Sequence, residues 1–483
     1  MAIAASHPAG SPSPYLRRSA PSAGLGLAVI AGMLAVGAGS AVALAFGELE
    51  AFYVALSAIA GIAVLFDFRI GAALLIVILP LETSSVAPHT LFNVPGLNPL
   101  SMLGLATLLS YTFRGNIVKL APKPLVWLYI VPILVAGVLG MPHISEIPWS
   151  YFELDPTSFT DATSYFRDEA IRPMVYVVIA LLVGKAVARS KRPEGFIYAL
   201  IAAVWAIAIV EIVFIGMSGV RLSLLASPSQ RQFFNQIGLH ANSLGRIFAV
   251  AYALLVFVWW ETKRPGLKSL LFLTVCVSVI AMLLTFSRGA IFGFFVVNAV
   301  FLLWKFNSKS VALALAAAAV AALIAPEYVW NRITFGFDAD ANTVSADRLN
   351  GIWLPLLPEL LKSPLWGNGL GSTLWSAPFK TGQMLLVNHP HNAYLEVLLD
   401  MGLIGAALLG AYYLHVWRGF RALGSNANLS AELRALFQGA TAALVCFFVT
   451  GMSGGSLRPD PEFAFLWIAI GMMYGMRERR AAG

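Results

Sequence analysis

Long apolar segments follow one another along almost the whole chain, with short polar stretches between them. A helix that crosses the hydrocarbon core of a bilayer needs roughly 20 apolar residues, within a range of roughly 17–25. The pattern therefore predicts an all-α, polytopic helical membrane protein with about 12–14 transmembrane helices. The expected spans are 24–46, 51–66, 70–86, 99–113, 124–141, 173–190, 195–217, 244–260, 269–287, 289–304, 310–325, 393–415, 435–452 and 462–476.

Composition supports a membrane protein and excludes several other classes. The chain is 59% hydrophobic and 12% charged, whereas soluble domains carry roughly 25% charged residues. Cys276 and Cys446 both lie in apolar runs, which excludes a disulfide framework and a cysteine zinc site. The run 24–46 is longer than the core of a typical signal peptide, so we expect a retained first span. The sequence has no Walker A motif and no glycine fingerprint after a strand, so we expect no ATP site.

The basic residues predict how the chain is oriented. Most of the 32 lysines and arginines fall in the tails and loops on the side of both termini. Cytoplasmic loops carry an excess of basic residues, so we expect both termini in the cytoplasm. The formal charge of +8 then reflects topology, and a nucleic-acid partner is not expected.

This orientation divides the chain into regions and brings three polar outward loops to one face of the membrane. The loop 326–392 is the longest of them and has the densest polar groups. We therefore expect it to carry the chemistry. The expected regions are a cytoplasmic tail 1–23, transmembrane helices over 24–325 with outward loops 142–172 and 218–243, an extracytoplasmic catalytic loop 326–392, C-terminal helices over 393–476 and a cytoplasmic tail 477–483.

Two arginines are candidate ligands of an anion. Arg288 stands between Ser287 and Gly289 where one span ends and the next begins. It either reaches the headgroups from a helix end or binds phosphate, for which the planar guanidinium is suited. Arg348 either pairs with a neighbour such as Asp347 or is a second guanidinium on the same anion. Asp338 and Asp340 resemble a metal-binding pair only weakly, and we expect no metal site.

A histidine precedes the apolar run that begins at residue 393. We expect His391 and Asn392 in the first turn of that helix, where the positive end of the helix dipole disfavours an imidazolium. A neutral His391 can accept a proton from a hydroxyl; the alternative is a capping residue. Glu396 and Asp400 are four apart and share one helix face, where they either position an arginine or form a structural polar seam.

Taken together, these segments resemble the bacterial O-antigen ligase and polymerase family of membrane glycosyltransferases. Ser287-Arg288-Gly289-Ala290 is similar to the family's first arginine motif. Arg348, Trp353 and the cluster Gly367-Asn368-Gly369-Leu370-Gly371 resemble its periplasmic-loop arginine and glycines. His391-Asn392 followed by Gly402 resembles its histidine motif, and residues 235–245 are also similar. Gly405 stands where some ligases carry threonine, which weakens the ligase branch and leaves the polymerase branch open.

The resemblance implies a GT-C-like fold and a metal-independent transfer of a glycan from an undecaprenyl pyrophosphate carrier, without a cofactor. The acceptor would be a sugar hydroxyl of another glycan or of lipid A–core, on the periplasmic face of the bacterial inner membrane. Arg288 and Arg348 would bind the diphosphate, and His391 would be the catalytic base. Ser287, Asp347, Asn392 and Glu396 would support them.

A flippase or transporter of lipid-linked glycans is the alternative class, because it is also polytopic and needs inward-facing charges. Transporters place ionisable groups near the middle of the membrane. Here such groups are few, with Glu211, Glu396 and Asp400 as the acidic ones. The concentration of polar groups in the outward loops favours an enzyme.

Overall fold

The computed structural model describes residues 49–82, 84–85, 88–91, 94, 96–113, 121–148, 151, 159, 161–227, 232–312, 327–334 and 340–482. These residues form an all-helical bundle, in which the one β contact is an isolated bridge between Leu91 and Val94. The N-terminal half contains α2 (Leu49–Phe66), α3 (Phe68–Ile78), α4 (Pro99–Thr112), α5 (Lys123–Leu125), η4 (Val126–Ile130), α6 (Val131–Gly140), α8 (Ala162–Tyr165), η6 (Phe166–Ile171), α9 (Met174–Ala188), α10 (Phe196–Ser218) and α11 (Leu222–Leu225).

The C-terminal half continues the bundle and adds a group of short helices before its last three long ones. Its elements are α12 (Ala241–Glu261), α13 (Pro265–Leu284), α14 (Arg288–Trp304), α16 (Glu327–Thr334), α17 (Ala341–Val344), η10 (Leu349–Trp353), α18 (Leu354–Leu356), η11 (Leu357–Leu361), η12 (Ser372–Trp375), α19 (Ala377–Lys380), α20 (Ala393–Gly424), α21 (Ala431–Gly451), η13 (Pro461–Phe463) and α22 (Ala464–Ala482).

The prediction of a polytopic helical membrane protein is confirmed. Each expected span that falls on described residues coincides with a helix, whereas 24–46 and most of 310–325 lie outside the described residues. Seven helical stretches of the described chain are long and apolar enough to cross a membrane, and shorter apolar helices accompany them, including Tyr53–Phe66, Phe68–Leu81 and Arg288–Trp304.

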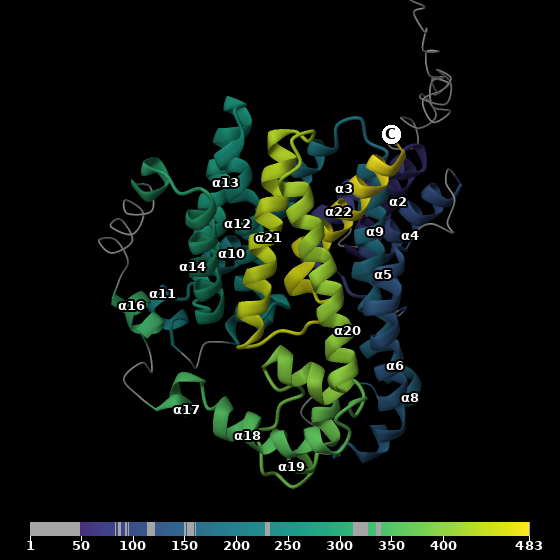
Figure 1. The fold of residues 1–483 in the computed structure, drawn as a ribbon, viewed down its shortest axis with the longest axis vertical. Helices are drawn as coiled ribbons and strands as arrows, with labels where there is room; N and C mark the ends of the chain where they lie inside the picture. Colours follow the sequence, from purple (N-terminus) through teal and green to yellow (C-terminus); the bar gives the residue numbers. More distant parts are fainter. Residues whose placement is uncertain are drawn as a thin grey trace, which may run out of the picture.

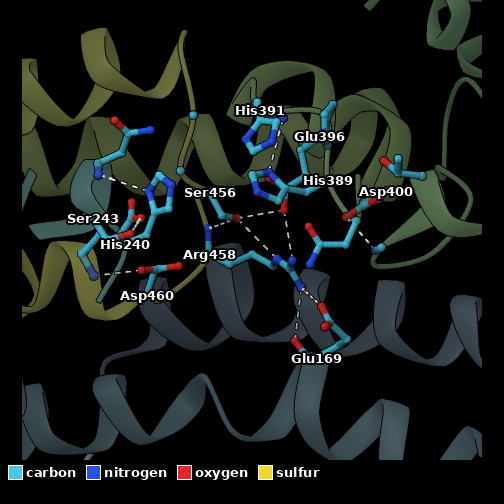
Figure 2. A pocket seen from close by; sticks show the side chains of 18 of the residues that line it. Glu169, His240, Ser243, His389, His391, Glu396, Asp400, Ser456, Arg458 and Asp460 are labelled. Carbon is cyan, nitrogen blue, oxygen red and sulfur yellow. Dashed lines mark hydrogen bonds and ion pairs between the residues drawn. The ribbon is translucent and has the colours of Figure 1, made fainter. Parts of the chain in front are cut away.

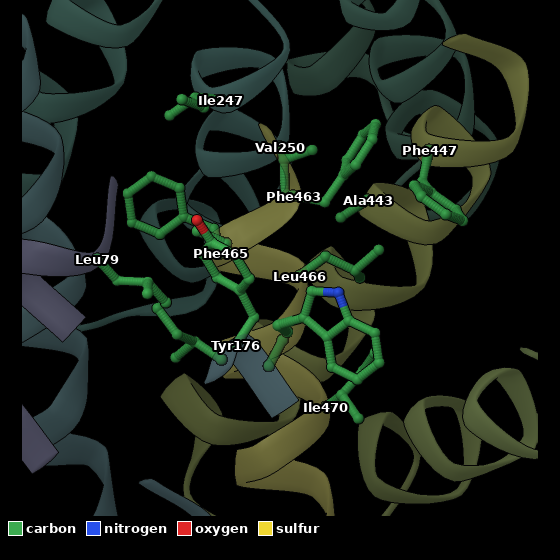
Figure 3. Close-up of a cluster of buried hydrophobic side chains, with 14 of the residues drawn as sticks. Leu79, Tyr176, Ile247, Val250, Ala443, Phe447, Phe463, Phe465, Leu466 and Ile470 are labelled. Carbon is green, nitrogen blue, oxygen red and sulfur yellow. The ribbon is translucent and has the colours of Figure 1, made fainter. Parts of the chain in front are cut away.

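The bundle is built around α12 and α22, which pack against α21 and α9 respectively. Figure 3 shows the apolar side chains that fill this centre, among them Ile247 of α12, Phe447 of α21 and Ile470 of α22. The backbones of α9 and α22 touch, because a Cβ at Gly475 would lie 2.0 Å from the carbonyl oxygen of Gly184. Small residues allow such close helix packing in membranes.

The short helices gather at one end of the bundle. In Figure 1 the C-terminal end of α22 is at the top, whereas α8, α17, α18 and α19 lie at the bottom. The expected convergence of loops 142–172 and 326–392 at one end, opposite the C-terminus, is therefore present. The loop 326–392 is also more structured than its polar sequence indicates, because most of its described residues form helices.

Helix α20 is interrupted at Gly402, which has φ +62° and ψ −167°. The break exposes backbone groups that the segment 364–369 satisfies: Asn368 N donates to Leu399 O at 2.8 Å, and Leu403 N donates to Pro364 O at 2.9 Å. A Cβ at Gly367 would lie 2.3 Å from the backbone of Asp400. Gly367 is therefore needed for the close approach of this segment to the break in α20, whereas Gly369 lies against the backbone of Gly140 in α6.

Candidate active site

A cavity of about 330 Å³ lies at the end of the bundle where the short helices gather. We call it the main cavity. Its walls come from segments far apart in the sequence: Tyr151, Phe159 and Glu169; residues 240–246 at the start of α12; residues 371–374; residues 388–400 leading into α20; and residues 453–462 between α21 and α22. All three outward loops predicted to be functional thus contribute to one cavity.

His391 lies in the wall of this cavity, directly before α20. The helix begins at Ala393 with Asn392 as its N-cap, whose side chain accepts from Tyr394 N at 3.1 Å and Leu395 N at 3.2 Å. The expectation that His391 lies in the first turn of the helix is therefore wrong, because His391 directly precedes the N-cap residue. Its backbone has φ +52°, a costly conformation for a non-glycine residue that is common at functional sites.

A second histidine, His389, holds the first in place. Its Nδ1 accepts a hydrogen bond from His391 N at 3.3 Å, and the two ring centroids are 4.0 Å apart. Burial lowers the pKa of His389 to about 4, and burial, His389 and Arg348 lower the pKa of His391 further. Both imidazoles are therefore neutral at pH 7. The main cause is burial, whereas the sequence indicated the helix dipole as the cause of the neutral state of His391.

Arg458 occupies the centre of the cavity wall, as Figure 2 shows. Its guanidinium forms ion pairs with Glu169 at 2.8 Å and Glu396 at 3.0 Å, and Ser456 Oγ donates to Glu396 at 3.1 Å. Arg458 thereby joins the N-terminal helices, the α21–α22 loop and the helix that follows His391. Of the two sequence interpretations of Glu396, the positioning of an arginine is the one observed.

A second buried arginine, Arg246, belongs to α12 and pairs with Glu462. Its Nε and Nη2 each lie 2.6 Å from a carboxylate oxygen of Glu462, and Ser243 Oγ donates to the same carboxylate. A Cβ at Gly454 would lie 2.9 Å from Nη1 of Arg246. Glycine at this position therefore lets the loop lie against the guanidinium.

Arg348 also contacts the loop between α21 and α22. Its Nη1 donates to the carbonyl oxygen of Ser453 at 2.5 Å, and Trp353 Nε1 donates to Pro390 O at 2.9 Å. Ser453 and Pro390 both line the main cavity. The arginine motif is thus attached to the segment that carries His391.

Arg288 and Ser287 lie at the start of α14, beside the cavity wall. Ser287 is the N-cap and donates to Asn242 Oδ1 at 3.0 Å, while Arg288 Nη2 donates to Val344 O at 3.3 Å. A Cβ at Gly289 would lie 3.1 Å from Ser453 Oγ. Both arginine motifs therefore meet the loop that contains Ser453, and neither arginine itself lines the cavity.

Strained backbone in the described chain is concentrated at the three motifs. The non-glycine residues with positive φ there are Phe286, Ala346, Asp347 and His391. Phe286 directly precedes Ser287, Ala346 and Asp347 directly precede Arg348, and His391 is the histidine of the third motif. Strain of about 1–3 kcal/mol per residue persists where surrounding structure holds it, typically at functional sites. This coincidence supports the assignment of these motifs to one site.

Other predicted residues have structural roles. Asp347 accepts from Asn342 Nδ2 at 2.9 Å and does not line the cavity. Asp400 accepts from Gly371 N and Ser372 N, each at 3.0 Å, and so holds the glycine cluster to α20. Asp340 is the N-cap of α17, whereas Asp338 lies outside the described residues. In the described part of the chain no group of three or more His, Cys, Asp or Glu residues could hold a metal.

Arg246 and Arg458 were not identified from the sequence as site residues, and His389 was considered only as an alternative to His391. A signal existed for Arg246, which stands inside an expected span, where a charged residue is costly unless paired. Arg458 stands in Gly454-Gly455-Ser456-Leu457-Arg458-Pro459-Asp460, a short outward loop that was not considered as a functional segment from the sequence. Their carboxylate partners are 60 or more residues away in sequence, so only the fold reveals the pairs.

Removal of the Arg458 side-chain charge is expected to destabilise the protein. Arg458→Met keeps the length of the apolar stem but leaves Glu169 and Glu396 without their shared partner. Loss of one partner from a buried ion pair costs about 3–5 kcal/mol. The midpoint of thermal unfolding in detergent should fall, and Glu396→Gln in the same chain should restore part of the loss. An unchanged midpoint for Arg458→Met would show that the network contributes no stability.

These features define a class: a polytopic helical membrane protein with a polar cavity of buried arginines and neutral histidines at one end of its bundle. Residues 273–410 match the family model described as O-antigen ligase. Over this stretch the predicted resemblance to the O-antigen ligase and polymerase family is confirmed. The matched stretch contains Arg288, Arg348 and His391, whereas Arg246 and Arg458 lie outside it. No curated protein matches the chain.

Proposed function

We propose that this protein transfers a glycan from an undecaprenyl pyrophosphate carrier onto a sugar hydroxyl at the periplasmic face of the bacterial inner membrane. The match of residues 273–410 to the O-antigen ligase model supports an enzyme of the O-antigen ligase and polymerase type. The observation that carries the finer proposal is the neutral His391 in a cavity whose wall, at Ser453 and Pro390, is contacted by Arg348 and Trp353. This arrangement supplies a base with a diphosphate ligand beside its cavity.

The diphosphate would bind where the main cavity meets the starts of α14 and η10, at the wall residue Ser453 that both starts contact. Arg288 and Arg348 both donate to backbone carbonyls of the segments they meet, and their guanidinium groups are suited to bidentate contacts with phosphate oxygens. Arg246 and Arg458 are already paired with carboxylates. Arg246 and Arg458 therefore join segments of the cavity wall. Because their charges are balanced by carboxylates, they attract an anionic ligand less than Arg288 and Arg348 do.

In the proposed reaction, an oxygen of the acceptor sugar attacks the anomeric carbon of the donor. The new glycosidic bond forms as the bond from that carbon to the diphosphate oxygen breaks, and undecaprenyl diphosphate leaves with the electron pair. The hydroxyl proton passes to His391. The arginines stabilise the charge that develops on the leaving group, which is often the largest contribution to catalysis. No metal or cofactor takes part in this proposal.

The pH dependence should reveal the base. In the free protein, burial and Arg348 keep the pKa of His391 well below its usual range, while a bound diphosphate adds negative charge nearby and should raise it. A base works only when unprotonated, so activity is lost as pH falls through its pKa. The acid limb of kcat/KM, which reports the free enzyme, should lie at lower pH than that of kcat. Coinciding limbs near pH 6.5, the unperturbed value, would contradict this environment.

We also propose that the cavity faces the periplasm and that both termini are cytoplasmic, because basic residues cluster at the opposite end. Single cysteines at the exposed positions Thr381 and Asn428 test this. A membrane-impermeant thiol reagent added to spheroplasts should label Thr381→Cys and should not label Asn428→Cys. The unchanged chain, with Cys276 and Cys446 in apolar helices, gives the background. The reverse pattern would place the cavity in the cytoplasm.

The structure favours an enzyme over a transporter of lipid-linked glycans. Glu396 and Asp400 belong to the wall of the main cavity at the end of the bundle. Glu211 of α10 is the remaining acidic candidate, and its carboxylate is buried without a hydrogen-bond partner among the described residues. A single isolated carboxylate does not form the binding site near the membrane centre that alternating access requires.

The direct test uses purified protein in lipid with a synthetic undecaprenyl pyrophosphate glycan and a glycan acceptor. Time-dependent formation of a longer glycan and release of undecaprenyl diphosphate are expected, with the same rate in the presence of EDTA. No transfer to either a second lipid-linked glycan or lipid A–core would remove the proposal. A deletion strain then separates the branches, because a ligase mutant loses capped lipopolysaccharide and a polymerase mutant loses long polysaccharide.

A further inference from the structure

A second cavity, of about 210 Å³, lies beside the main one at the same end of the bundle. Its walls come from the short helix η5 (Met141–Glu146) that follows α6, from the residues around η11, and from η12 and α19. It is lined by polar and charged side chains, four of which carry full charges: Glu146, Glu359, Lys362 and Lys380. Nothing in the proposed reaction uses this second cavity.

The charges of the second cavity are paired with each other. Lys380 Nζ lies 2.5 Å from Glu146 Oε2, and Lys362 Nζ lies 2.7 Å from Glu359 Oε2. Two lysines and two glutamates give no net charge, so neither an anion nor a cation is favoured. A neutral ligand with many hydroxyls fits best, since each hydroxyl can donate to a carboxylate or accept from an ammonium.

The two cavities share one wall, the short helix η12. Gly371, Thr373 and Leu374 line the main cavity, whereas Ser372 and Trp375 line the second. Asp400 fixes this wall, because its carboxylate accepts from Ser372 N at 3.0 Å and Ser372 Oγ at 2.7 Å. The two cavities are therefore separated by one short helix.

The second cavity lies on the side of the bundle away from Arg288. Helix α6 packs against α20, α20 against α21, and α21 against α14, an order that Figure 1 shows from right to left. The second cavity is at the α6 side and Arg288 is at the start of α14. In a direct displacement at an anomeric carbon, the incoming oxygen and the leaving group lie on opposite faces of the sugar. The acceptor must then approach from the α6 side.

We propose that the second cavity binds the acceptor glycan, holding the sugar units next to the one that carries the attacking hydroxyl. This inference rests on the proposed function, and it assigns a substrate to a site outside the reacting centre. Lys362 and Lys380 donate to hydroxyl oxygens of these units, and Glu146 and Glu359 accept from their hydroxyl protons. Such contacts make acceptor affinity depend on glycan length.

The test fills the second cavity without changing its charge. Ala377 lines it and is exposed, and its backbone N–H donates to Glu359 Oε1 at 3.3 Å, a bond that a substitution retains. Ala377→Phe blocks the cavity. Gln383→Phe is the matched control, because Gln383 is exposed nearby and lines neither cavity. Lys380→Ala is a second, milder variant that breaks an exposed ion pair, at little cost in stability.

The probe is a set of oligosaccharides of graded length, released by mild acid from the polysaccharide of the cells that make this protein. Their dissociation constants are measured by calorimetry on protein in lipid nanodiscs, without donor. Ala377→Phe should raise the dissociation constant of the longer oligosaccharides about tenfold or more, since several charge-assisted hydrogen bonds are lost. Gln383→Phe should bind as the wild type does, and the monosaccharide should bind all variants alike.

Equal binding of long oligosaccharides to Ala377→Phe, Lys380→Ala and wild type would overturn the proposal, as would no binding to wild type. In transfer assays the blocked variant should raise KM for the acceptor and leave KM for the donor unchanged. A rise in the donor KM instead would assign the second cavity to the donor glycan and overturn the inference. Absence of transfer by the wild type, with length-dependent binding intact, would count against the proposed function alone.

Discussion

Replacement of His391 by glutamine is expected to lower the rate of glycan transfer by about 10²–10⁴-fold, the usual contribution of a general base. Glutamine can still form hydrogen bonds in the cavity but cannot accept the hydroxyl proton at neutral pH. Donor binding depends on the arginines, so the dissociation constant of the undecaprenyl pyrophosphate glycan should change little. Single-turnover transfer and donor binding, measured on the same preparation in lipid, check both expectations.

His389→Gln is the matched control, because the structure offers two neighbouring neutral histidines. His389 also lines the main cavity, and its Nδ1 accepts from His391 N. A glutamine oxygen can replace this acceptor, so we expect a loss of no more than about tenfold, within the range for one hydrogen bond. A larger loss for His389→Gln than for His391→Gln would exchange their roles. Nearly full transfer by His391→Gln would make that residue a structural cap.

Lysine in place of Arg288 or Arg348 is expected to lower transfer by about 10²–10³-fold, comparable to removal of one group that stabilises a developing anion. Lysine keeps the charge but lacks the planar fork needed for bidentate contacts with a diphosphate. Arg348 should be as sensitive as Arg288, because it is tied to Ser453 and follows the strained residues Ala346 and Asp347. Both variants should also bind the donor more weakly, measured with the same lipid-linked glycan.

Arg167→Lys is the control for these two variants. Arg167 lies at the same end of the bundle, but its side chain is 63% exposed and pairs with Asp168 at the surface. Its replacement should leave transfer and membrane abundance unchanged. Normal transfer by Arg288→Lys, at normal abundance, would show that this arginine reaches the headgroups and takes no part in binding the diphosphate. The same result for Arg348→Lys would limit that residue to holding the loop of Ser453.

Much of the architecture follows from the sequence, because a membrane span is a local property. About 20 consecutive apolar residues suffice to define one, and the helices α12, α13 and α21 lie where the apolar runs place them. The three motifs at Arg288, Arg348 and His391 were also recognisable, since each combines a chemically suited side chain with a polar outward position. The neutral state of His391 was predicted too, although its main cause is burial.

Tertiary structure alone decided how these parts form one site. Arg458 gains its role from Glu169 and Glu396, which lie on different helices, and ion pairs over such sequence distances leave no local pattern. The sequence shows the glycine cluster, but only the structure shows that Gly367 lies against the backbone of α20 beside its break at Gly402. Sequence therefore determined which segments cross the membrane and which side chains could react. The packing of distant helices determined which of those side chains share a cavity, because pairing and burial depend on neighbours in space.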